Sequence, residues 1–253
     1  MQEVSPAYVK LTENNGIGTI EFFHPNHNAL PSGLLLELEK MIHEAGRNDA
    51  IKVIVLQSAG DRTFCAGASL NELLSIKNEA SGELFFSGFA NVINALRRCP
   101  KIIIGRVQGK AVGGGVGLAA AADYCLATKY AAIKLSELSI GIGPFVIEPA
   151  VSRKIGKTAM QQITLDAESF FSAEFAKEKG LYANVFESEM ALDEAVHSLA
   201  SKLSGYNIEA LKEMKTVFWE GTDHWDKLLK ERAKISGKLV LSDFTKIALK
   251  KFK

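Results

Sequence analysis

A stretch with almost no side chains offers the first candidate for chemistry. The segment "GKAVGGGVGLAAAADY" (109–124) follows an apolar run and holds four glycines within five positions, Gly113, Gly114, Gly115 and Gly117. A strand, a glycine turn and a helix of small residues leave free N–H groups that a polarised oxygen can approach closely. Close packing of the helix on a sheet would need the same residues. A dinucleotide-binding pattern, G-x-G-x-x-G, that starts at Gly113 would need a glycine where the chain has Leu118. A phosphate loop that ends at 156–158 would need its first glycine where the chain has Val151.

A second glycine turn strengthens the functional interpretation. The apolar run "IKVIVLQ" (51–57) predicts a buried strand and leads into "AGDRTFCAGASLNELL" (59–74). This segment again places a glycine turn directly before a predicted helix. The repeated arrangement favours use of the bare backbone as a binding surface.

Glu137 is the side chain best suited to proton exchange. It stands in "KLSELSIG" between Leu135 and Leu138. If these apolar neighbours bury it, desolvation raises the pKa of its carboxyl group, which suits a base working near neutral pH. Without burial it would be an ordinary carboxylate at the end of a strand.

The elements that must position these groups alternate between strand and helix. We expect a hairpin over 8–23 that turns at 14–16, and buried strands at 51–57 and 101–109. Ser32 is expected to cap a helix over 30–48, and Pro100 to stop another over 80–99. Short strands are expected at 123–128, 131–137 and 138–142, and helices at 188–205, 207–221, 223–239 and 242–252. We place a boundary near residue 190, between an α/β region (1–190) and a helical region (191–253).

Composition excludes several classes of protein. The 253 residues carry a net charge of +1 and are 47% hydrophobic, which indicates a folded chain without the basic excess of a nucleic-acid-coating protein. No apolar run is long enough to span a membrane, and residues 1–15 lack the pattern of a secretory leader. Three scattered cysteines, Cys65, Cys99 and Cys125, give neither a disulfide framework nor a metal site. We therefore expect a cytoplasmic protein.

Four segments, taken in order, resemble the enoyl-CoA hydratase/isomerase (crotonase) superfamily. The two glycine segments, "IVLQSAGDRTFCAGASL" and "GRVQGKAVGGGVGLAAAADY", are similar to its two signature blocks. "HPNHNAL" (24–30) is similar to its early turn, and "SELSIGIGPFVIEPAVSRKIGK" (136–157) to its third block, although "GPFVIEP" departs from the usual pattern. Each motif is weak alone, but their order and spacing across nearly the whole chain are specific.

The resemblance implies a fold, an assembly and a substrate. The fold is a spiral of ββα units with a C-terminal helical region that builds trimers or dimers of trimers. The substrate is an acyl-CoA thioester, so no separate cofactor is expected. The thioester oxygen would lie between the N–H groups of Ala68 and Gly114, which favour the charge of an enolate over the neutral carbonyl. The residues expected to bind substrate are Ala66, Gly67, Ala68, Gly113, Gly114 and Gly117.

The number of acids separates the possible reactions. Hydratases of the family use two glutamates, of which the second matches Glu137, whereas the position of the first holds Gly117. A single acid suffices to move a proton between two carbons, so double-bond isomerisation is favoured. The alternatives are a hydratase, including a methylglutaconyl type, in which Glu148 replaces the missing acid, and a decarboxylase of a β-carboxyacyl-CoA. Glu148 otherwise suits the first turns of a helix.

Two further alternatives belong to other classes. Some superfamily members bind RNA through a lysine-rich early helix, but the predicted helix at 34–47 mixes acidic and basic residues. We therefore expect no nucleic-acid partner. A homologue that binds CoA esters without catalysis would keep Ala68 and Gly114 but would not need Glu137.

The helical region predicts self-association. Its apolar residues exceed what one amphipathic tail needs to bury, among them Leu228, Leu229, Leu239, Leu241 and Phe244. We expect a homotrimer or hexamer in light scattering at micromolar concentration. A monomer under these conditions would contradict the expectation.

Overall fold

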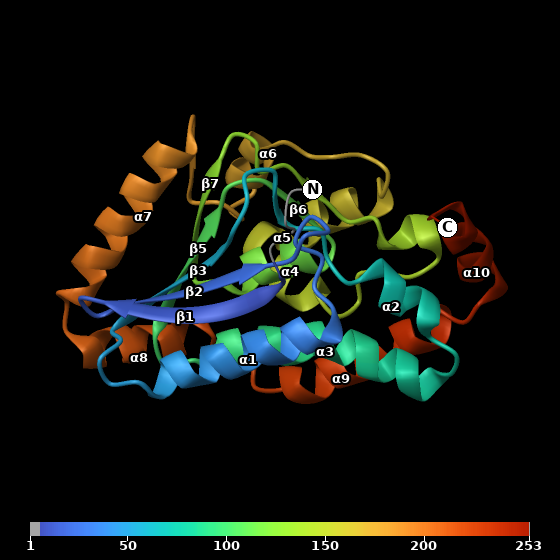
Figure 1. Cartoon of the computed structure of the whole chain (residues 1–253), viewed down its shortest axis with the longest axis horizontal. Helices are drawn as coiled ribbons and strands as arrows, with labels where there is room; N and C mark the ends of the chain where they lie inside the picture. Colours follow the sequence, from blue (N-terminus) through green and yellow to red (C-terminus); the bar gives the residue numbers. More distant parts are fainter. Residues whose placement is uncertain (1–5, 253) are drawn as a thin grey trace.

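The strands divide between a sheet of six strands and a sheet of three (Figure 1). A computed structural model describes residues 6–252. Residues 1–5, which belong to the predicted α/β region (1–190) and to the stretch 1–15 considered as a leader, lie outside the described residues, as does Lys253. The large sheet has the order β1-β2-β3-β5-β7-β9 and is parallel except for the β1–β2 hairpin. The small sheet, β4-β6-β8, is parallel. The strands are β1 (Tyr8–Asn14), β2 (Ile17–Phe23), β3 (Val53–Ser58), β4 (Thr63–Cys65), β5 (Ile102–Val107), β6 (Lys110–Val112), β7 (Tyr124–Thr128), β8 (Ile133–Lys134) and β9 (Asn184–Phe186).

Successive ββα units build both sheets at once. From β3 onward, the first strand of each unit joins the large sheet and the second joins the small one, which confirms the predicted spiral. The helices are α1 (Ser32–Arg47), α2 (Leu70–Ser75), α3 (Glu79–Arg98), α4 (Gly114–Ala121), the 3-10 helix η1 (Glu137–Ile140), α5 (Glu148–Leu165), α6 (Ala173–Glu178), α7 (Glu189–Ser204), α8 (Ile208–Phe218), α9 (Trp225–Leu239), α10 (Asp243–Leu249) and the 3-10 helix η2 (Lys250–Phe252).

Both faces of the large sheet are covered, which explains the apolar character of its strands. Along β3, Ile54 and Leu56 belong to the main core, whereas Val53 and Val55 belong to a second cluster with α7. Alternate residues of a strand point to opposite faces, so a strand covered on both sides is apolar throughout.

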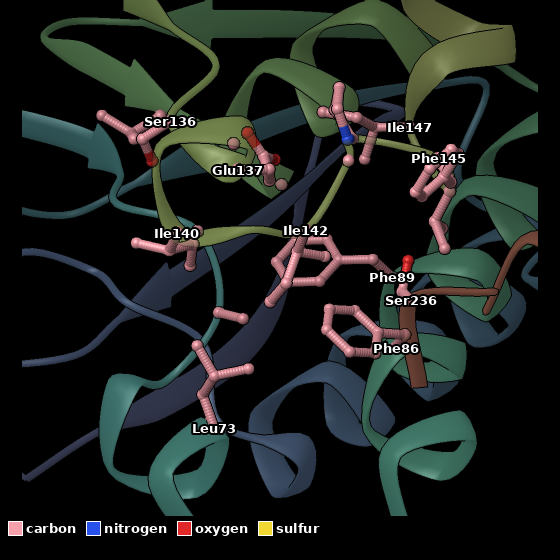
Figure 2. Close-up of a pocket in the computed structure, with 18 of the residues that line it drawn as sticks. Leu73, Phe86, Phe89, Ser136, Glu137, Ile140, Ile142, Phe145, Ile147 and Ser236 are labelled. Carbon is pink, nitrogen blue, oxygen red and sulfur yellow. The ribbon is translucent and has the colours of Figure 1, made fainter. Parts of the chain in front are cut away.

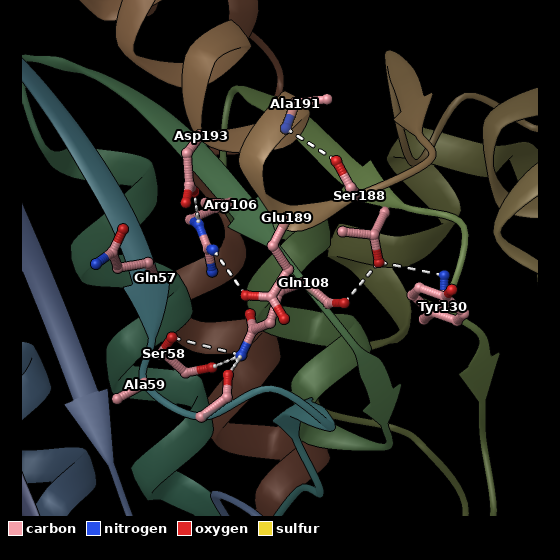
Figure 3. Close-up of polar contacts among 12 residues, drawn as sticks. Gln57, Ser58, Ala59, Arg106, Gln108, Tyr130, Ser188, Glu189, Ala191 and Asp193 are labelled. Atoms are coloured by element: carbon pink, nitrogen blue, oxygen red, sulfur yellow. Dashed lines mark hydrogen bonds and ion pairs between the residues drawn. The ribbon is translucent and has the colours of Figure 1, made fainter.

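Polar contacts join α7 to a central strand of the large sheet (Figure 3). The guanidinium of Arg106 on β5 donates hydrogen bonds to the carboxylates of Glu189 (3.1 Å) and Asp193 on α7. The predicted boundary near residue 190 therefore coincides with the first turn of a helix that packs against the α/β region. Whether the two regions are separate domains stays a prediction.

Helices α3 and α9 cross at very short range. A Cβ atom on Gly82 would lie 2.7 Å from the Cα atom of Gly237, and one on Gly237 would lie 2.5 Å from the backbone nitrogen of Glu83. Near the other end of the pair, Arg97 and Asp226 form an ion pair at 2.9 Å. The helices are therefore antiparallel, and the glycines let α9 reach the elements around α3.

Several local expectations are confirmed and two are wrong. The hairpin turns at Asn15 and Gly16, which both have positive φ, as predicted. Residues 138–142 do not form a strand: most of them belong to η1, which ends at Gly141 in the left-handed region. Ser32 does not cap α1, because Pro31 holds the cap position and the Ser32 hydroxyl donates to Glu72 instead.

The apolar residues of the C-terminal helices differ in exposure. Leu229 is buried against the core, while Phe244 is 63% exposed. Exposed apolar side chains such as Phe244 could be covered by a second copy of the chain, and self-association stays a prediction. In the described part of the chain no helix has the length and apolar character needed to cross a membrane.

Candidate functional site

A cavity of about 460 Å³ opens beside the two glycine turns (Figure 2). Phenylalanines of α3 form one wall, and η1 with the segment that follows it forms another. The wall is mostly apolar, and among the described residues that line it only Lys134 and Glu137 carry charge. The lining residues are Ala66, Gly67, Ala68, Leu70, Leu73, Phe85, Phe86, Phe89, Val112, Gly113, Gly114, Lys134, Ser136, Glu137, Ser139, Ile140, Ile142, Gly143, Pro144, Phe145, Val146, Ile147, Phe170, Ser236 and Leu249.

Two backbone N–H groups on the cavity wall have no acceptor among the described residues. Ala68 forms a parallel bridge with Leu30, and in this register Ser69 donates to Leu30 while the Ala68 amide is left out. Gly114 is the first residue of α4, so its N–H lies ahead of the helical ladder. A Cβ atom on Gly67 would be 3.5 Å from the Gly114 nitrogen, which shows how closely the two turns approach. That the two N–H groups donate to one oxygen stays a prediction.

The glycine triplet is bare because its surroundings leave no space for side chains. A Cβ atom on Gly114 would lie 2.4 Å from the Phe89 ring, and one on Gly115 would lie 2.3 Å from the Cys65 carbonyl oxygen. Gly113 has φ +52°, and its Cβ atom would lie 2.8 Å from Oε1 of Glu137. Backbone conformation and close contact therefore both require glycine here.

Glu137 directs its carboxyl group into the cavity from the start of η1 (Figure 2). Its Oε2 atom is buried and has no hydrogen-bond partner among the described residues. Burial raises the pKa of this carboxyl from 4.5 to about 7. The expected neighbour Leu135 is buried, but Leu138 is 40% exposed. The cavity wall, rather than Leu138, encloses the carboxyl group.

Gly117 does not reach the cavity wall because Ile147 stands in front of it. A Cβ atom on Gly117 would lie 2.5 Å from Cγ2 and 2.8 Å from Cβ of Ile147, which does line the cavity. The space beside residue 117, where the resemblance places the first glutamate of a hydratase, is therefore filled by an apolar side chain of the "GPFVIEP" segment. No side chain fits at residue 117 in this arrangement.

Glu148 lies next to the cavity in sequence but is not among its lining residues. Its carboxylate accepts a hydrogen bond from the Ser152 hydroxyl at 2.6 Å and lies 3.7 Å from the Arg232 guanidinium. Its place in the first turn of α5 is as expected. These contacts direct the side chain along α5 and towards α9.

Two nearby residues have structural roles. Ser69 caps α2 by accepting a hydrogen bond from the Glu72 amide, as expected. Burial raises the pKa of the Cys65 thiol to about 12, so it is not an activated nucleophile. The described residues contain no cluster of three or more His, Cys, Asp or Glu side chains that could hold a metal ion.

The sequence analysis missed the residues that shape the cavity. Phe86, Phe89 and Ile147 belong to apolar stretches that look like ordinary core, so no pattern separates them from packing residues. Phe170, which is half exposed, lies between two ammonium groups, with Lys110 and Lys134 at 5.0 and 5.2 Å from its ring centroid. In the sequence, the one feature that points to this part of the cavity rim is the Phe170–Phe171 pair, which follows a polar stretch.

Comparisons with known proteins identify the family of the chain. The family model for enoyl-CoA hydratase/isomerase matches residues 12–247. A peroxisomal Δ(3,5)-Δ(2,4)-dienoyl-CoA isomerase of Arabidopsis thaliana is 30% identical over 209 residues, 76% of this chain and 73% of that protein. A mitochondrial enoyl-CoA hydratase of Pongo abelii is 29% identical over 237 residues, 93% of this chain and 79% of that protein. The crystal structure of an enoyl-CoA hydratase from Bacillus halodurans superposes with a TM-score of 0.89 at 22% identity, over 96% of this chain and 99% of that one.

The chain therefore belongs to the enoyl-CoA hydratase/isomerase family of the crotonase superfamily. It is an enzyme of a family for which the CoA thioester is a substrate rather than a resident cofactor. One named relative is peroxisomal and another is mitochondrial, so the cytoplasmic location stays a prediction.

Replacing Glu137 by glutamine should stabilise the fold in a pH-dependent way. Between about pH 4.5 and 7 the unfolded chain releases this proton while the folded chain keeps it, so wild-type stability falls as pH rises through that window. Glutamine has no such loss. We expect Glu137→Gln to match wild type near pH 4.5 and to exceed it by up to about 3 kcal/mol at pH 8. Urea unfolding across pH tests this, with the exposed Glu178→Gln as control. Parallel pH profiles for wild type and Glu137→Gln would contradict it.

Adding one methyl group at Gly117 should destabilise the protein. Overlap with Ile147 predicts a cost of about 1–3 kcal/mol for Gly117→Ala in urea unfolding. In an Ile147→Gly background the added cost should be smaller, because both the Cγ2 and the Cβ atom that the new methyl group would meet are then absent. Gly33→Ala on α1 is the control, since no atom lies within 4 Å of its new Cβ. Equal costs of Gly117→Ala in both backgrounds would show that Ile147 does not block the position.

Proposed function

We propose that the protein is an acyl-CoA isomerase that shifts a C=C bond along the acyl chain, with Glu137 moving the proton. The observation that carries this proposal is that Glu137 is the single carboxyl group among the described residues that line the cavity. Ile147 occupies the space at Gly117 where a second acid would stand. Hydration would need another group to hold and activate water, whereas isomerisation does not.

The proposed reaction needs only the groups on the cavity wall. The Glu137 carboxylate removes a proton from the α-carbon of a 3-enoyl thioester, and the electron pair delocalises into a dienolate. The N–H groups of Ala68 and Gly114 donate to the thioester oxygen as it gains charge. Glu137 then returns the proton to the γ-carbon, which leaves the 2-enoyl isomer. No atom is gained or lost.

The electrostatics of the cavity support this role for Glu137. A carboxyl group with a pKa of about 7 is partly ionised at neutral pH and can both accept and return a proton. The apolar wall excludes water, which strengthens the interaction of the two N–H groups with the enolate oxygen.

The charged rim supports an anionic substrate. The ammonium groups of Lys110 and Lys134 flank the half-exposed ring of Phe170, which lines the cavity together with Lys134. Phosphate groups and an aromatic base are the parts of coenzyme A that such a rim can hold.

Proton exchange measured in deuterated water tests the proposal. Wild type should convert a 3-enoyl-CoA to the 2-enoyl isomer and incorporate deuterium without net hydration. Glu137→Gln should abolish exchange, a loss of at least 100-fold, because the amide keeps the shape but cannot accept the proton. Binding of a saturated acyl-CoA, measured by calorimetry, should change little in that variant.

Glu148→Gln is the matched control and should exchange deuterium at nearly the wild-type rate. The alternatives give different results. Hydration of a 2-enoyl-CoA at about 1–1000 per second that is lost in Glu148→Gln would identify a hydratase with a relocated acid. Release of CO2 from a β-carboxyacyl-CoA that survives Glu137→Gln would identify a decarboxylase. Binding of acyl-CoA without any turnover would leave a non-catalytic binder.

A further inference from the structure

A buried hydroxyl group on the cavity wall has no role in the proposed reaction. Ser236 on α9 is 1% exposed, yet it lines the cavity. Its hydroxyl forms no hydrogen bond within the described part of the chain and, unlike Oε2 of Glu137, it is not fully enclosed, so it is accessible from the cavity. Figure 2 draws this hydroxyl on the other side of the Phe86 and Phe89 side chains from Glu137. An apolar chain that enters the cavity would displace water from this hydroxyl and leave it unpaired, which is costly, so a ligand group that pairs with the hydroxyl is favoured there.

The crossing of α3 and α9 sets the distance of Ser236 from the two free N–H groups. The ring of Phe89 lies against the Gly114 backbone, while Gly82 lies against Gly237, the neighbour of Ser236. Ser236 is therefore about two turns along α3 from the level of Phe89. At 1.5 Å per residue this is about 10 Å, the span of several C–C bonds.

Charge limits what can pair with this hydroxyl. Among the described lining residues the only cation is Lys134, whose ammonium donates to the Glu168 carbonyl and lies over Phe170 at the rim. Arg232, one turn before Ser236 on α9, already lies 3.7 Å from the Glu148 carboxylate, so a carboxylate beside Ser236 would be buried without a free counter-ion, at high cost. A neutral ketone or hydroxyl group carries no such cost.

We propose that Ser236 selects acyl groups that carry a neutral oxygen, a ketone or a hydroxyl, several carbons from the thioester. This inference rests on the proposed acyl-CoA substrate and concerns the far end of the same cavity. The apolar side chains between the two ends, such as Phe86 and Ile142, hold the intervening carbons. The hydroxyl of Ser236 donates to a ketone, or exchanges a hydrogen bond with a hydroxyl group, at the end of the chain.

A matched pair of substrates tests the inference. The pair is oct-3-enoyl-CoA and 7-oxo-oct-3-enoyl-CoA, which have equal chain length and differ in one distal oxygen. Wild type should prefer the oxo ester by about tenfold in kcat/KM, since the plain ester leaves the hydroxyl unpaired. In Ser236→Ala this ratio should fall to near one. Calorimetry with the saturated pair, octanoyl-CoA and 7-oxo-octanoyl-CoA, gives the same comparison without turnover.

Ser87→Ala is the control variant. Ser87 is a half-buried serine on α3 whose hydroxyl already donates to the Glu83 carbonyl, and it does not line the cavity. It should keep the wild-type ratio. Thermal unfolding of both variants checks that α3 and α9 stay packed.

The outcomes separate the two proposals. Preferential binding of the oxo ester that disappears in Ser236→Ala supports the inference, whichever reaction follows. Equal affinity for both esters, unchanged in Ser236→Ala, overturns the inference and leaves the acyl-CoA function standing. If neither ester binds or reacts, the proposed function fails and the inference fails with it.

Discussion

The site depends on one constraint: the backbone of residues 113–115 lies in close contact with three other segments of the chain. Glu137, Phe89 and Cys65 each occupy the space where a side chain of this triplet would lie. Because these contacts come from η1, α3 and β4, three distant segments are held around one turn. The same absence of side chains leaves the Gly114 amide open at the start of α4, beside Ala68. Packing and the exposure of the N–H donors are therefore one arrangement.

Burial of a single carboxyl group determines the chemistry that the cavity can support. Enclosure raises the pKa of Glu137 to about 7, and its buried oxygen has no partner among the described residues. This costs stability, and such costs are common where a group is kept ready for proton transfer. Ile147 adds to the effect, since it excludes a second acid at Gly117 and keeps that side of the cavity apolar. Our proposal of isomerisation depends on this environment, because that reaction needs one proton-transfer group.

The far side of the cavity depends on a different contact. The glycine pair at the crossing of α3 and α9 lets α9 contribute Ser236 to a wall otherwise made by the α/β region. The helical region thus takes part in the cavity in addition to any role in assembly. Ser236 lies 99 residues along the chain from Glu137 and further from the N–H donors, so changes in α9 can alter the proposed selection without touching Glu137 or the N–H donors.

The sequence alone determined the glycine turns, the alternation of strands and helices, and the identity of Glu137 as the candidate base. These features are local: a glycine triplet, a β-branched run and a motif at fixed spacing carry their own physical requirements. The tertiary structure decided what the local patterns leave open. Residues 138–142 read as a strand but fold mainly as η1, because the chain must turn to bring Glu137 beside Gly113. The contact between Ile147 and Gly117, the direction of Glu148 and the place of Ser236 depend on how distant segments pack. No spacing within one segment encodes a contact whose partner lies tens of residues away.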